Sequence, residues 1–300
     1  MHHLLIAGGT GFIGYHLCKM FKKKGWKVSS ISINRPKGKR FVRGVKYISL
    51  DLTKKKLIKN RLQGDYSHII NASGFTTNLY SKKNKKKIFQ SHFNGTKNLI
   101  DYFKNKNIEH FIQIGSSAEY GKAKSPLKES SHCLPSNHYG KAKLKASRYI
   151  LKVTKKKNFS VNILRLFQVY GPNQGDNRVV MQILKACIKK KKFPTSDGNQ
   201  IRDFCYIDDV TRAIESIFKK DISAKILNIG FGKGITIKKL IICIKKIARG
   251  GLPQYGLFNS RNHENPSLIP SIEKAKKVLG WKPIISLEKG LNLTKRSING

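Results

Sequence analysis

A tyrosine and a lysine four positions apart, Tyr139 and Lys143, are the side chains of this sequence that most directly suggest chemistry. That spacing is about one helical turn, so both share a face of the helix expected over 139–156. A phenol with its ordinary pKa of about 10 is a poor base at neutral pH, but a neighbouring ammonium stabilises the phenolate and lowers that pKa. The hydroxyl of Ser116, at the end of the strand expected over 109–115, can share the hydrogen bond to a substrate oxygen. We therefore predict that these three side chains move a proton while a hydride moves to or from a nicotinamide.

Taken alone, such a pair could be an ordinary surface contact, and a glycine-rich stretch near the start of the chain decides against that interpretation. Residues 8–14 directly follow the apolar run 4–7, which is the pattern of a strand, a tight turn and a helix. Gly8 permits the turn, Gly11 lets the backbone approach a pyrophosphate, and Gly14 lets helix and strand pack closely. The helix N-terminus offers free N–H groups and a partial positive charge to that anion. The two patterns together predict a dinucleotide-dependent enzyme.

Short apolar runs alternate with helical stretches through the first half of the chain, as in a parallel sheet covered on both faces. The strands are expected at 3–7, 27–33, 45–50, 67–72, 109–115 and 160–166, and the helices near 12–24, 54–62, 85–106 and 139–156. Beyond residue 167, glycine and proline pairs interrupt this rhythm. We therefore expect a dinucleotide-binding domain over 1–167, to which parts of 203–230 return, and a smaller substrate lobe over 168–300.

The charge of the chain is strongly positive, with 61 Lys and Arg against 16 Asp and Glu, a formal +45. Such a balance is typical of proteins that bind nucleic acid or anionic membranes. Here the lysine runs are scattered and arginine, the usual phosphate-gripping residue, is scarce. We expect a solvated basic surface with neither nucleic acid nor membrane as partner, although the field can speed capture of an anionic substrate. A non-catalytic protein that binds NAD(P) or nucleic acid remains the alternative from another functional class.

The five cysteines have no paired spacing, so neither a disulfide framework nor a zinc site is expected. No apolar run reaches the length that spans a membrane, and no signal peptide is recognised before the first strand. These observations predict a cytoplasmic protein without a metal site.

The chain resembles the extended short-chain dehydrogenase/reductases that act on nucleotide sugars, the NAD-dependent epimerase/dehydratase family. This resemblance implies an α/β fold, with a Rossmann-type doubly wound parallel sheet and a smaller mixed C-terminal lobe that binds the substrate. It also implies a nucleotide-sugar substrate and the possibility of a homodimer. The landmarks that carry it are 8–14, 51–52, 94–99, 116–121, 139–143, 165–172, 202–210, 228–230 and 279–283.

The resemblance also implies a role for individual residues. Ser116 and Tyr139 would be catalytic, with Tyr139 as the acid/base, and Lys143 would tune Tyr139 and hold the nicotinamide ribose. Ser117 would contact the substrate. The cofactor pyrophosphate would lie against Gly8, Gly11, Phe12, Ile13 and Gly14, and the adenine against Asp51 and Leu52. For Asp51 the alternative is a helix N-cap.

Two arginines of the second half, Arg202 and Arg261, would clamp the diphosphate of the sugar nucleotide. A forked guanidinium that is always charged suits that task. The alternative is that each forms a salt bridge, to Asp203 or to Glu264. The Asp208-Asp209 pair resembles a metal site, but the family uses this stretch structurally, so no metal is expected there.

One departure from the family pattern concerns the cofactor. NAD-binding members usually carry an aspartate at the end of the second strand, to hold the adenine ribose. Here that position is Ser32, and cationic side chains follow it. Together with Ser32 they suit the extra phosphate of NADP, so we predict NADP, with NAD as the alternative. The residues after Ser32 are Asn34, Arg35, Lys37, Lys39 and Arg40.

A second departure concerns the reaction. Sugar dehydratases carry an acid just after the catalytic Ser or Thr, whereas here Ser117 and Ala118 intervene before Glu119. Elimination needs a positioned acid and base, so dehydratase activity is disfavoured. Hydride transfer at C4 of a hexose remains, and the tail of the chain resembles the abequose and paratose synthases. We therefore predict a 4-ketoreductase, with a 4-epimerase of the UDP-glucose type as the alternative.

Overall fold

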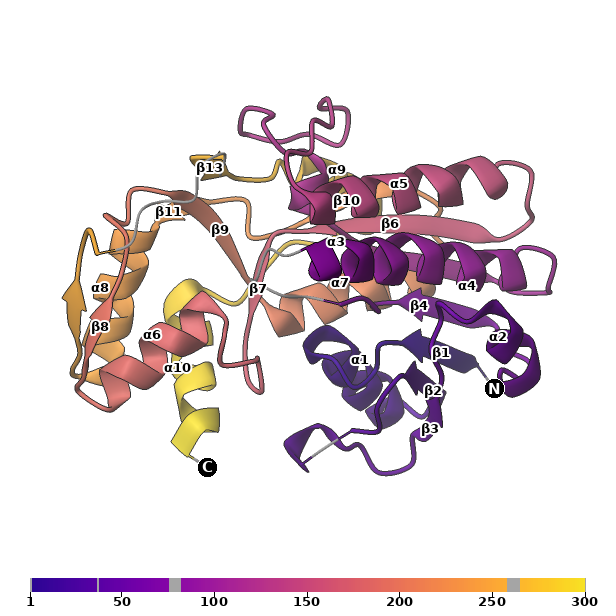
Figure 1. Cartoon of the computed structure of the whole chain (residues 1–300), viewed down its shortest axis with the longest axis horizontal. Coiled ribbons are helices and arrows are strands. Elements are labelled where there is room, and N and C mark those ends of the chain that lie inside the picture. The colour runs from indigo at the N-terminus through magenta and orange to yellow at the C-terminus, as the bar shows by residue number, and fades with distance from the viewer. Residues whose placement is uncertain (1, 37, 76–81, 258–264, 300) are drawn as a thin grey trace. The chain divides into compact units, whose positions relative to one another are not determined.

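The computed structural model describes residues 2–36, 38–75, 82–257 and 265–299 of the chain (Figure 1). The chain divides into two compact units. The first unit comprises Met1–Gly121, Cys133–Arg165 and Ile214–Leu227, and the second comprises the rest, namely Lys122–His132, Leu166–Ala213 and Asn228–Gly300. The short segment Lys122–His132 thus belongs to the second unit although it lies in the first half of the sequence.

A seven-stranded sheet in the order β10-β6-β5-β4-β1-β2-β3 forms the centre of the first unit. Its strands are β1 His3–Ala7, β2 Lys27–Ser32, β3 Lys46–Ser49, β4 His68–Asn71, β5 His110–Ser116, β6 Ser160–Leu166 and β10 Lys225–Ile229. Strand β1 pairs in parallel with both β2 and β4, and β2–β3 and β4–β5 are also parallel. The six expected strands and the doubly wound α/β fold are confirmed. The order reverses beside β1, and ligands of such sheets bind outside the carboxyl ends of the strands at that point.

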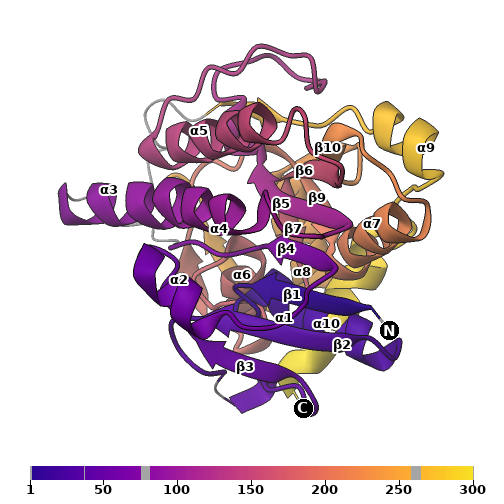
Figure 2. The same cartoon turned by 90° about the vertical axis from the view of Figure 1, so that its right-hand side faces the viewer.

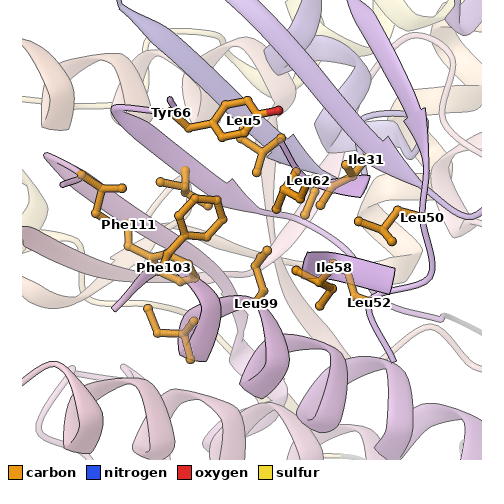
Figure 3. Packing of buried hydrophobic residues seen from close by; sticks show 14 of the residues in the cluster. Leu5, Ile31, Leu50, Leu52, Ile58, Leu62, Tyr66, Leu99, Phe103 and Phe111 are labelled. Atoms are coloured by element: carbon orange, nitrogen blue, oxygen red, sulfur yellow. The ribbon is translucent and has the colours of Figure 1, made fainter. Parts of the chain in front are cut away.

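Helices cover both faces of this sheet. Their bounds are α1 Phe12–Lys23, α2 Lys55–Arg61, α3 Lys82–Phe89, α4 Gly95–Phe103 and α5 His138–Val153. Figure 2 shows α2, α4 and α5 along one face. Successive side chains of a strand point to opposite faces, so Leu5 and Ala7 join the core under these helices while Leu4 and Ile6 point toward the face that α1 covers. Figure 3 shows Leu99 and other members of this buried cluster, and each fully buried side chain of this kind contributes about 2 kcal/mol.

The helix expected over 85–106 is interrupted in the middle. A π-helical turn, Gln90–Asn94, joins α3 to α4. The extra residue of a π turn rotates the side chains that follow, and such turns often occur at functional sites. Here the turn buries the imidazole of His92, which the helical spacing did not single out.

The second unit contains a mixed sheet in which β9 is central. Strand β11 pairs antiparallel with β9, whereas β7 and β13 pair with it in parallel, and a separate parallel pair joins β8 to β12. This is the mixed C-terminal lobe that the sequence predicts. The strands are β7 Gln168–Tyr170, β8 Lys192–Pro194, β9 Ile201–Tyr206, β11 Gly234–Thr236, β12 Leu252–Gln254 and β13 Ser267–Leu268. The helices are α6 Val179–Ile188, α7 Ile207–Lys219, α8 Ile237–Ala248, α9 Glu273–Leu279 and α10 Leu287–Asn299, and α7 belongs to the first unit from residue 214 onward.

Two buried aspartates organise the loops of the second unit. Asp203 accepts hydrogen bonds from the backbone N–H groups of Phe231, Gly232 and Lys233. The carboxylate of Asp209 accepts from two backbone N–H groups, at 284 and 285, and from the Arg212 side chain. Asp209 is thus engaged in structural contacts. In the part of the chain that the structure describes, no helix is long and apolar enough to cross a membrane.

Candidate active site

Ser116 is the last residue of β5 and caps the short 3₁₀ turn Ser117–Glu119. Its Oγ accepts a hydrogen bond from the N–H of Ala118 at 3.2 Å, while its own N–H donates to Glu119 Oε1 at 2.9 Å. These two hydrogen bonds form a capping box, which fixes the serine through both its side chain and its backbone. Because the hydroxyl oxygen acts as an acceptor here, the hydroxyl proton remains able to donate to a substrate oxygen.

Helix α5 presents Tyr139 and Lys143 beside this turn. The side chain of Asn137 caps the helix by accepting from the N–H of Gly140 at 2.8 Å. A Cβ at Gly140 would lie 2.3 Å from the carbonyl oxygen of Ala118, so only glycine lets the first turn of α5 approach the Ser116 turn this closely. The structure therefore brings the predicted serine, tyrosine and lysine to one edge of the sheet.

Lys143 is buried, with a side chain that donates from Nζ to the carbonyl oxygen of Ile114 at 2.7 Å. Burial lowers the pKa of Lys143 to about 8, against the opposing attraction of the Glu119 carboxylate. An ammonium carries three N–H donors, so two remain beyond the contact with β5. The lysine is held in place and is readily deprotonated compared with an exposed one.

His92 is a neighbour of Tyr139 that sequence reasoning missed. The two rings meet edge to face, with centroids 4.9 Å apart. His92 Nε2 bonds to the carbonyl oxygen of Phe75 at 2.9 Å, and a Cβ at Gly74 would lie 2.0 Å from the imidazole. Burial, and next the charge of Lys143, lower the pKa of His92 to about 3, so the ring is neutral. The π-helical turn that points it inward has no signature in the residue spacing.

Glu119 is a second residue whose role the sequence left open. It is fully buried, and its Oε2 accepts from Arg165 Nε and from Ser147 Oγ, both at 3.0 Å. Its Oε1 holds the N–H of Ser116. Both carboxylate oxygens are thus engaged in orienting the turn, which gives a structural reason why Glu119 is not placed as the acid of an elimination.

The glycine-rich stretch forms a tight turn between β1 and α1. Gly8 has a positive φ of 82°, and a Cβ there would lie 2.7 Å from the carbonyl oxygen of Ala72. A Cβ at Gly14 would lie 2.2 Å from the carbonyl oxygen of Gly8, and the N–H of Gly11 donates to that same oxygen at 2.9 Å. Side chains at Gly8 and Gly14 would clash with this turn, so the structure supports the turn at Gly8 and the close packing at Gly14. The approach of Gly11 to a pyrophosphate stays a prediction.

The start of α1 is suited to an anion. Gly11 is its N-cap and makes no side-chain cap hydrogen bond, and the first turn, which contains Phe12 and Ile13, carries no acidic residue. The first amides of a helix have no partner within the helix and carry partial positive charge. The chain's own residues therefore fit the pyrophosphate of a dinucleotide.

At the end of β2 the structure distinguishes between the candidate cations. Ser32 Oγ accepts from the N–H of Thr10 at 3.4 Å, which places the serine on the glycine turn. Arg40 Nη1 donates to the carbonyl oxygen of Thr10 at 3.2 Å, whereas Arg35 is exposed. Lys37 lies outside the described residues. Arg40, rather than Arg35, is thus the arginine that contacts the turn.

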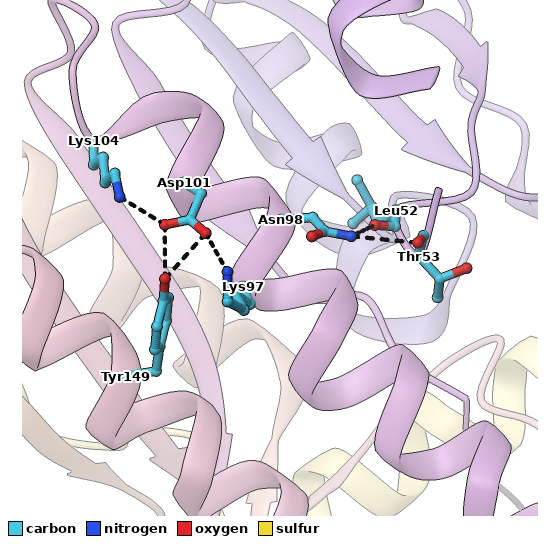
Figure 4. Close-up of polar contacts among 7 residues, drawn as sticks. All are labelled: Leu52, Thr53, Lys97, Asn98, Asp101, Lys104 and Tyr149. Carbon is cyan, nitrogen blue, oxygen red and sulfur yellow. Dashed lines mark hydrogen bonds and ion pairs between the residues drawn. The ribbon is translucent and has the colours of Figure 1, made fainter. Parts of the chain in front are cut away.

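Asp51 follows β3 and binds its own turn. Its Oδ1 accepts from the N–H and the hydroxyl of Thr53, at 2.9 and 2.8 Å, whereas the N-cap of α2 is Lys54. The helix N-cap alternative for Asp51 is therefore wrong. The adjacent carbonyl oxygens of Leu52 and Thr53 accept from Asn98 Nδ2 of α4, which fixes this turn against the helix (Figure 4).

The same figure shows how α4 is joined to α5. Asp101 of α4 accepts from the Tyr149 hydroxyl of α5 and from the ammonium groups of Lys97 and Lys104. These contacts lock the helix that carries Tyr139 onto its neighbour.

In the second unit, Arg202 lies on β9 and is buried. Its Nη1 donates to the carbonyl oxygens of Ile201 at 2.8 Å and Pro266 at 3.2 Å. Burial raises the pKa of the adjacent Asp203 to about 7, although its three backbone N–H donors oppose the shift. Arg261 and Glu264 lie outside the described residues.

Comparison with known proteins bears on the family and the fold of the chain. The model of the NAD dependent epimerase/dehydratase family matches residues 4–230. A UDP-glucuronate 4-epimerase of Thermodesulfobacterium geofontis is 26% identical over 315 residues, which cover 100% of this chain and 96% of the relative.

Solved structures of 4-epimerases have the same fold. A UDP-glucose 4-epimerase of Thermotoga maritima, with UDP-glucose, superposes with a TM-score of 0.89 at 23% identity and covers 99% of this chain and 98% of its own. A UDP-glucuronic acid 4-epimerase of Bacillus cereus, in complex with UDP-glucuronic acid and NAD, has a TM-score of 0.88 at 24% identity and covers 99% of both chains.

Proposed function

Because the chain belongs to the NAD-dependent epimerase/dehydratase family, we propose that it inverts C4 of a nucleotide-bound hexose or hexuronate by reversible hydride transfer. The relative and the two solved structures above carry the names of UDP-glucuronate and UDP-glucose 4-epimerases, which favours epimerisation over the 4-ketoreductase predicted from the sequence. The observation that carries the proposal is the close approach of α5 to the Ser116 turn, which depends on Gly140.

The chain's own residues would carry the proton. When bound, a nicotinamide dinucleotide supplies an acceptor, and then a donor, for the C4 hydrogen and its electron pair. Tyr139 takes the proton of the C4 hydroxyl as the carbonyl forms and returns it as the carbonyl is reduced on its other face. Ser116 donates a hydrogen bond to the same oxygen. No net oxidation occurs, since every electron pair and proton that leaves C4 and its oxygen comes back.

Lys143 would act on Tyr139 in two ways. A cation near a phenol lowers its pKa, and the buried position of Lys143 strengthens that effect because the surroundings screen charge weakly. Its two remaining N–H donors can also hold hydroxyls of the cofactor ribose. The neutral ring of His92 packs edge to face against Tyr139 without adding a competing charge.

We take NAD as the cofactor, because the Bacillus cereus 4-epimerase structure holds NAD. Ser32 and Arg40 keep NADP, with the 4-ketoreductase reaction, as the second candidate, since an arginine beside the glycine turn suits a ribose phosphate. In an Arg40→Ala variant, NADP affinity falls and NAD affinity stays if the second candidate is right. Arg35→Ala is made beside it, because the sequence also predicts a cofactor contact for this exposed arginine, and the pair shows which arginine the phosphate needs.

For the substrate, we propose that Arg202 binds the diphosphate of the nucleotide sugar and that Arg261 assists. The forked guanidinium of Arg202 is fixed on β9 by two carbonyl oxygens. A fixed fork loses little entropy when it binds a phosphate in two places.

The direct test supplies purified enzyme with NAD in amounts far below substrate, and either UDP-glucose or UDP-glucuronate. The proposal predicts that the C4 epimer accumulates well beyond the NAD present, without net formation of NADH. Reduction of a 4-keto sugar with one NADPH oxidised per molecule of product would instead identify a reductase. Tyr149→Phe, on the same helix but bonded to Asp101, is the matched control for Tyr139→Phe.

A further inference from the structure

A cavity of about 1100 Å³ opens at the opposite edge of the first unit's sheet. Its lining includes residues just before or at the start of four parallel strands: His2 before β1, Trp26 before β2, His68 at the start of β4 and His110 at the start of β5. The glycine turn and Ser116 lie at the other ends of these strands. Nothing in the proposed epimerase chemistry uses the residues of this cavity.

Aromatic rings hold this cavity together. His2 stacks on Trp26 with centroids 4.7 Å apart, and its edge meets His68 at 5.1 Å. His68 stacks on His110 at 4.9 Å, and Phe218 packs against both histidines. His68 and His110 are each only 2% exposed. The imidazoles of His68 and His110 are therefore fixed by packing, whereas His2 lies at the exposed side of the cluster.

From this arrangement we propose that His2, His68 and Glu109 bind one divalent cation of the zinc class. One ligand atom from each of the three lies within 4.8 Å of the others. Zinc is bound by imidazole nitrogen and carboxylate oxygen at about 2 Å, which puts neighbouring ligand atoms about 3.3 Å apart. His2 and Glu109 are exposed, so small side-chain rotations can close the remaining distance.

The distance between His68 and Glu109 leaves room for an ion between their ligand atoms. His68 Nε2 lies 3.7 Å from Glu109 Oε2, longer than a direct hydrogen bond. The other ring nitrogen, Nδ1, lies 2.8 Å from Ser67 Oγ, a partner of the kind that orients metal-bound histidines. With Nδ1 as the donor, the lone pair of Nε2 points toward Glu109.

The remaining acidic residues of the cavity are already engaged. Glu215 pairs with Lys24 at 2.8 Å and with Lys219 at 2.7 Å. Asp221 pairs with His110 Nε2 at 3.1 Å and accepts from the Ser160 hydroxyl at 3.0 Å. The cavity lining holds three carboxylates and also three lysines, Lys24, Lys157 and Lys219, so its own charges balance in a chain that carries +45. Glu109 is the carboxylate placed to face the two imidazoles.

His2 is also tied to the sheet, because its carbonyl oxygen accepts from the N–H of Lys27 at 3.2 Å. A metal bound by His2 and His68 would therefore fasten the first residues of the chain to the start of β4. Three protein ligands leave a fourth position for water. The ion would stabilise this edge of the sheet, remote from the proposed reaction, and its open water position distinguishes it from a closed zinc site with four protein ligands. The proposal departs from the sequence-based expectation that the protein has no metal site.

The test uses the full-length enzyme with its cofactor, treated with a chelator and then titrated with Zn²⁺ by calorimetry and with Co²⁺ by visible absorption. The proposal predicts one ion per chain, a Co²⁺ spectrum of low-coordinate nitrogen and oxygen ligands, and a rise of several degrees in the melting temperature. His2→Gln and Glu109→Gln should each weaken binding at least tenfold, and the double variant should abolish it, with turnover unchanged. Both positions are exposed, so the variants are expected to fold.

The matched control is His132→Gln, an exposed histidine of the second unit, which should bind the ion as the wild type does. Failure of the wild type to bind would overturn the proposal. So would binding that survives in the double variant, since the ion would then be held elsewhere. These outcomes are independent of whether the enzyme epimerises a sugar.

Discussion

The two edges of the first unit's parallel sheet hold polar groups by different means. At the carboxyl edge, the Glu119 carboxylate holds the N–H of Ser116, a carbonyl oxygen of β5 accepts from Lys143, and Gly140 lets the helix that carries Tyr139 approach closely. At the amino edge, stacked rings fix His68 and its neighbours, and carboxylates line the cavity. In a parallel α/β unit, helix N-termini lie at the carboxyl edge and helix C-termini at the amino edge. The helix dipoles therefore favour anions at one edge and cations at the other, and the residues follow that polarity.

The largest expected effect comes from Tyr139→Phe at the carboxyl edge. Loss of a positioned acid/base lowers turnover by about 10²- to 10⁴-fold. Cofactor affinity and Co²⁺ binding at the amino edge should stay unchanged. Turnover of the variant is compared with that of Tyr149→Phe, which should remain within a few-fold of the wild type. Equal losses in the two variants would mean that Tyr139 has only a packing role.

Gly14→Ala tests whether the two edges are independent. The new Cβ would lie 2.2 Å from the carbonyl oxygen of Gly8, so the turn must open and the helix N-terminus must shift. Cofactor affinity, measured by calorimetry, should fall about tenfold or more. Gly95→Ala is the control, since its Cβ would make an ordinary 3.4 Å contact with Leu52. If Gly14→Ala weakened metal binding at the amino edge as much as cofactor binding, the two edges would not be independent.

A smaller effect should appear in the pH dependence of stability. Burial lowers the pKa of Lys143 in the folded state from 10.5 to about 8, so between these pH values the unfolded chain holds a proton that the folded chain lacks. The free energy of unfolding should then rise with pH across that window, by at most about 1.4 kcal/mol per pH unit. Denaturant unfolding of the wild type and of Lys143→Met at several pH values measures the difference. If the free energy of unfolding depended on pH in the same way in the wild type and in Lys143→Met, folding would not lower the pKa of Lys143.

The sequence predicted what depends on local spacing. The strands follow from hydrophobic periodicity, the glycine turn from the spacing of its glycines, and the pair of Tyr139 and Lys143 from their separation of four residues. The burial of Glu119 could not be predicted in this way, because a carboxylate is buried only when partners such as Arg165, distant in the sequence, bind it.

Other features were hidden for similar reasons. The π turn that directs His92 toward Tyr139 could not be predicted, since no residue type in Gln90–Asn94 marks a π turn. Arg40 contacts the glycine turn and Arg35 does not, which depends on the path of the chain after β2. The amino-edge cluster joins His2, His68 and Glu109, which only the sheet order brings together.

The central claim, reversible hydride transfer at the carboxyl edge with Tyr139 as the proton carrier, is tested most directly with a substrate deuterated at C4. Wild-type enzyme with NAD should yield the C4 epimer of UDP-glucose or UDP-glucuronate with the deuterium retained at C4, because the hydrogen leaves and returns without meeting solvent. Tyr139→Phe should yield little product in the same time. Loss of the label to water, or unchanged product formation in the Tyr139→Phe variant, would contradict the account.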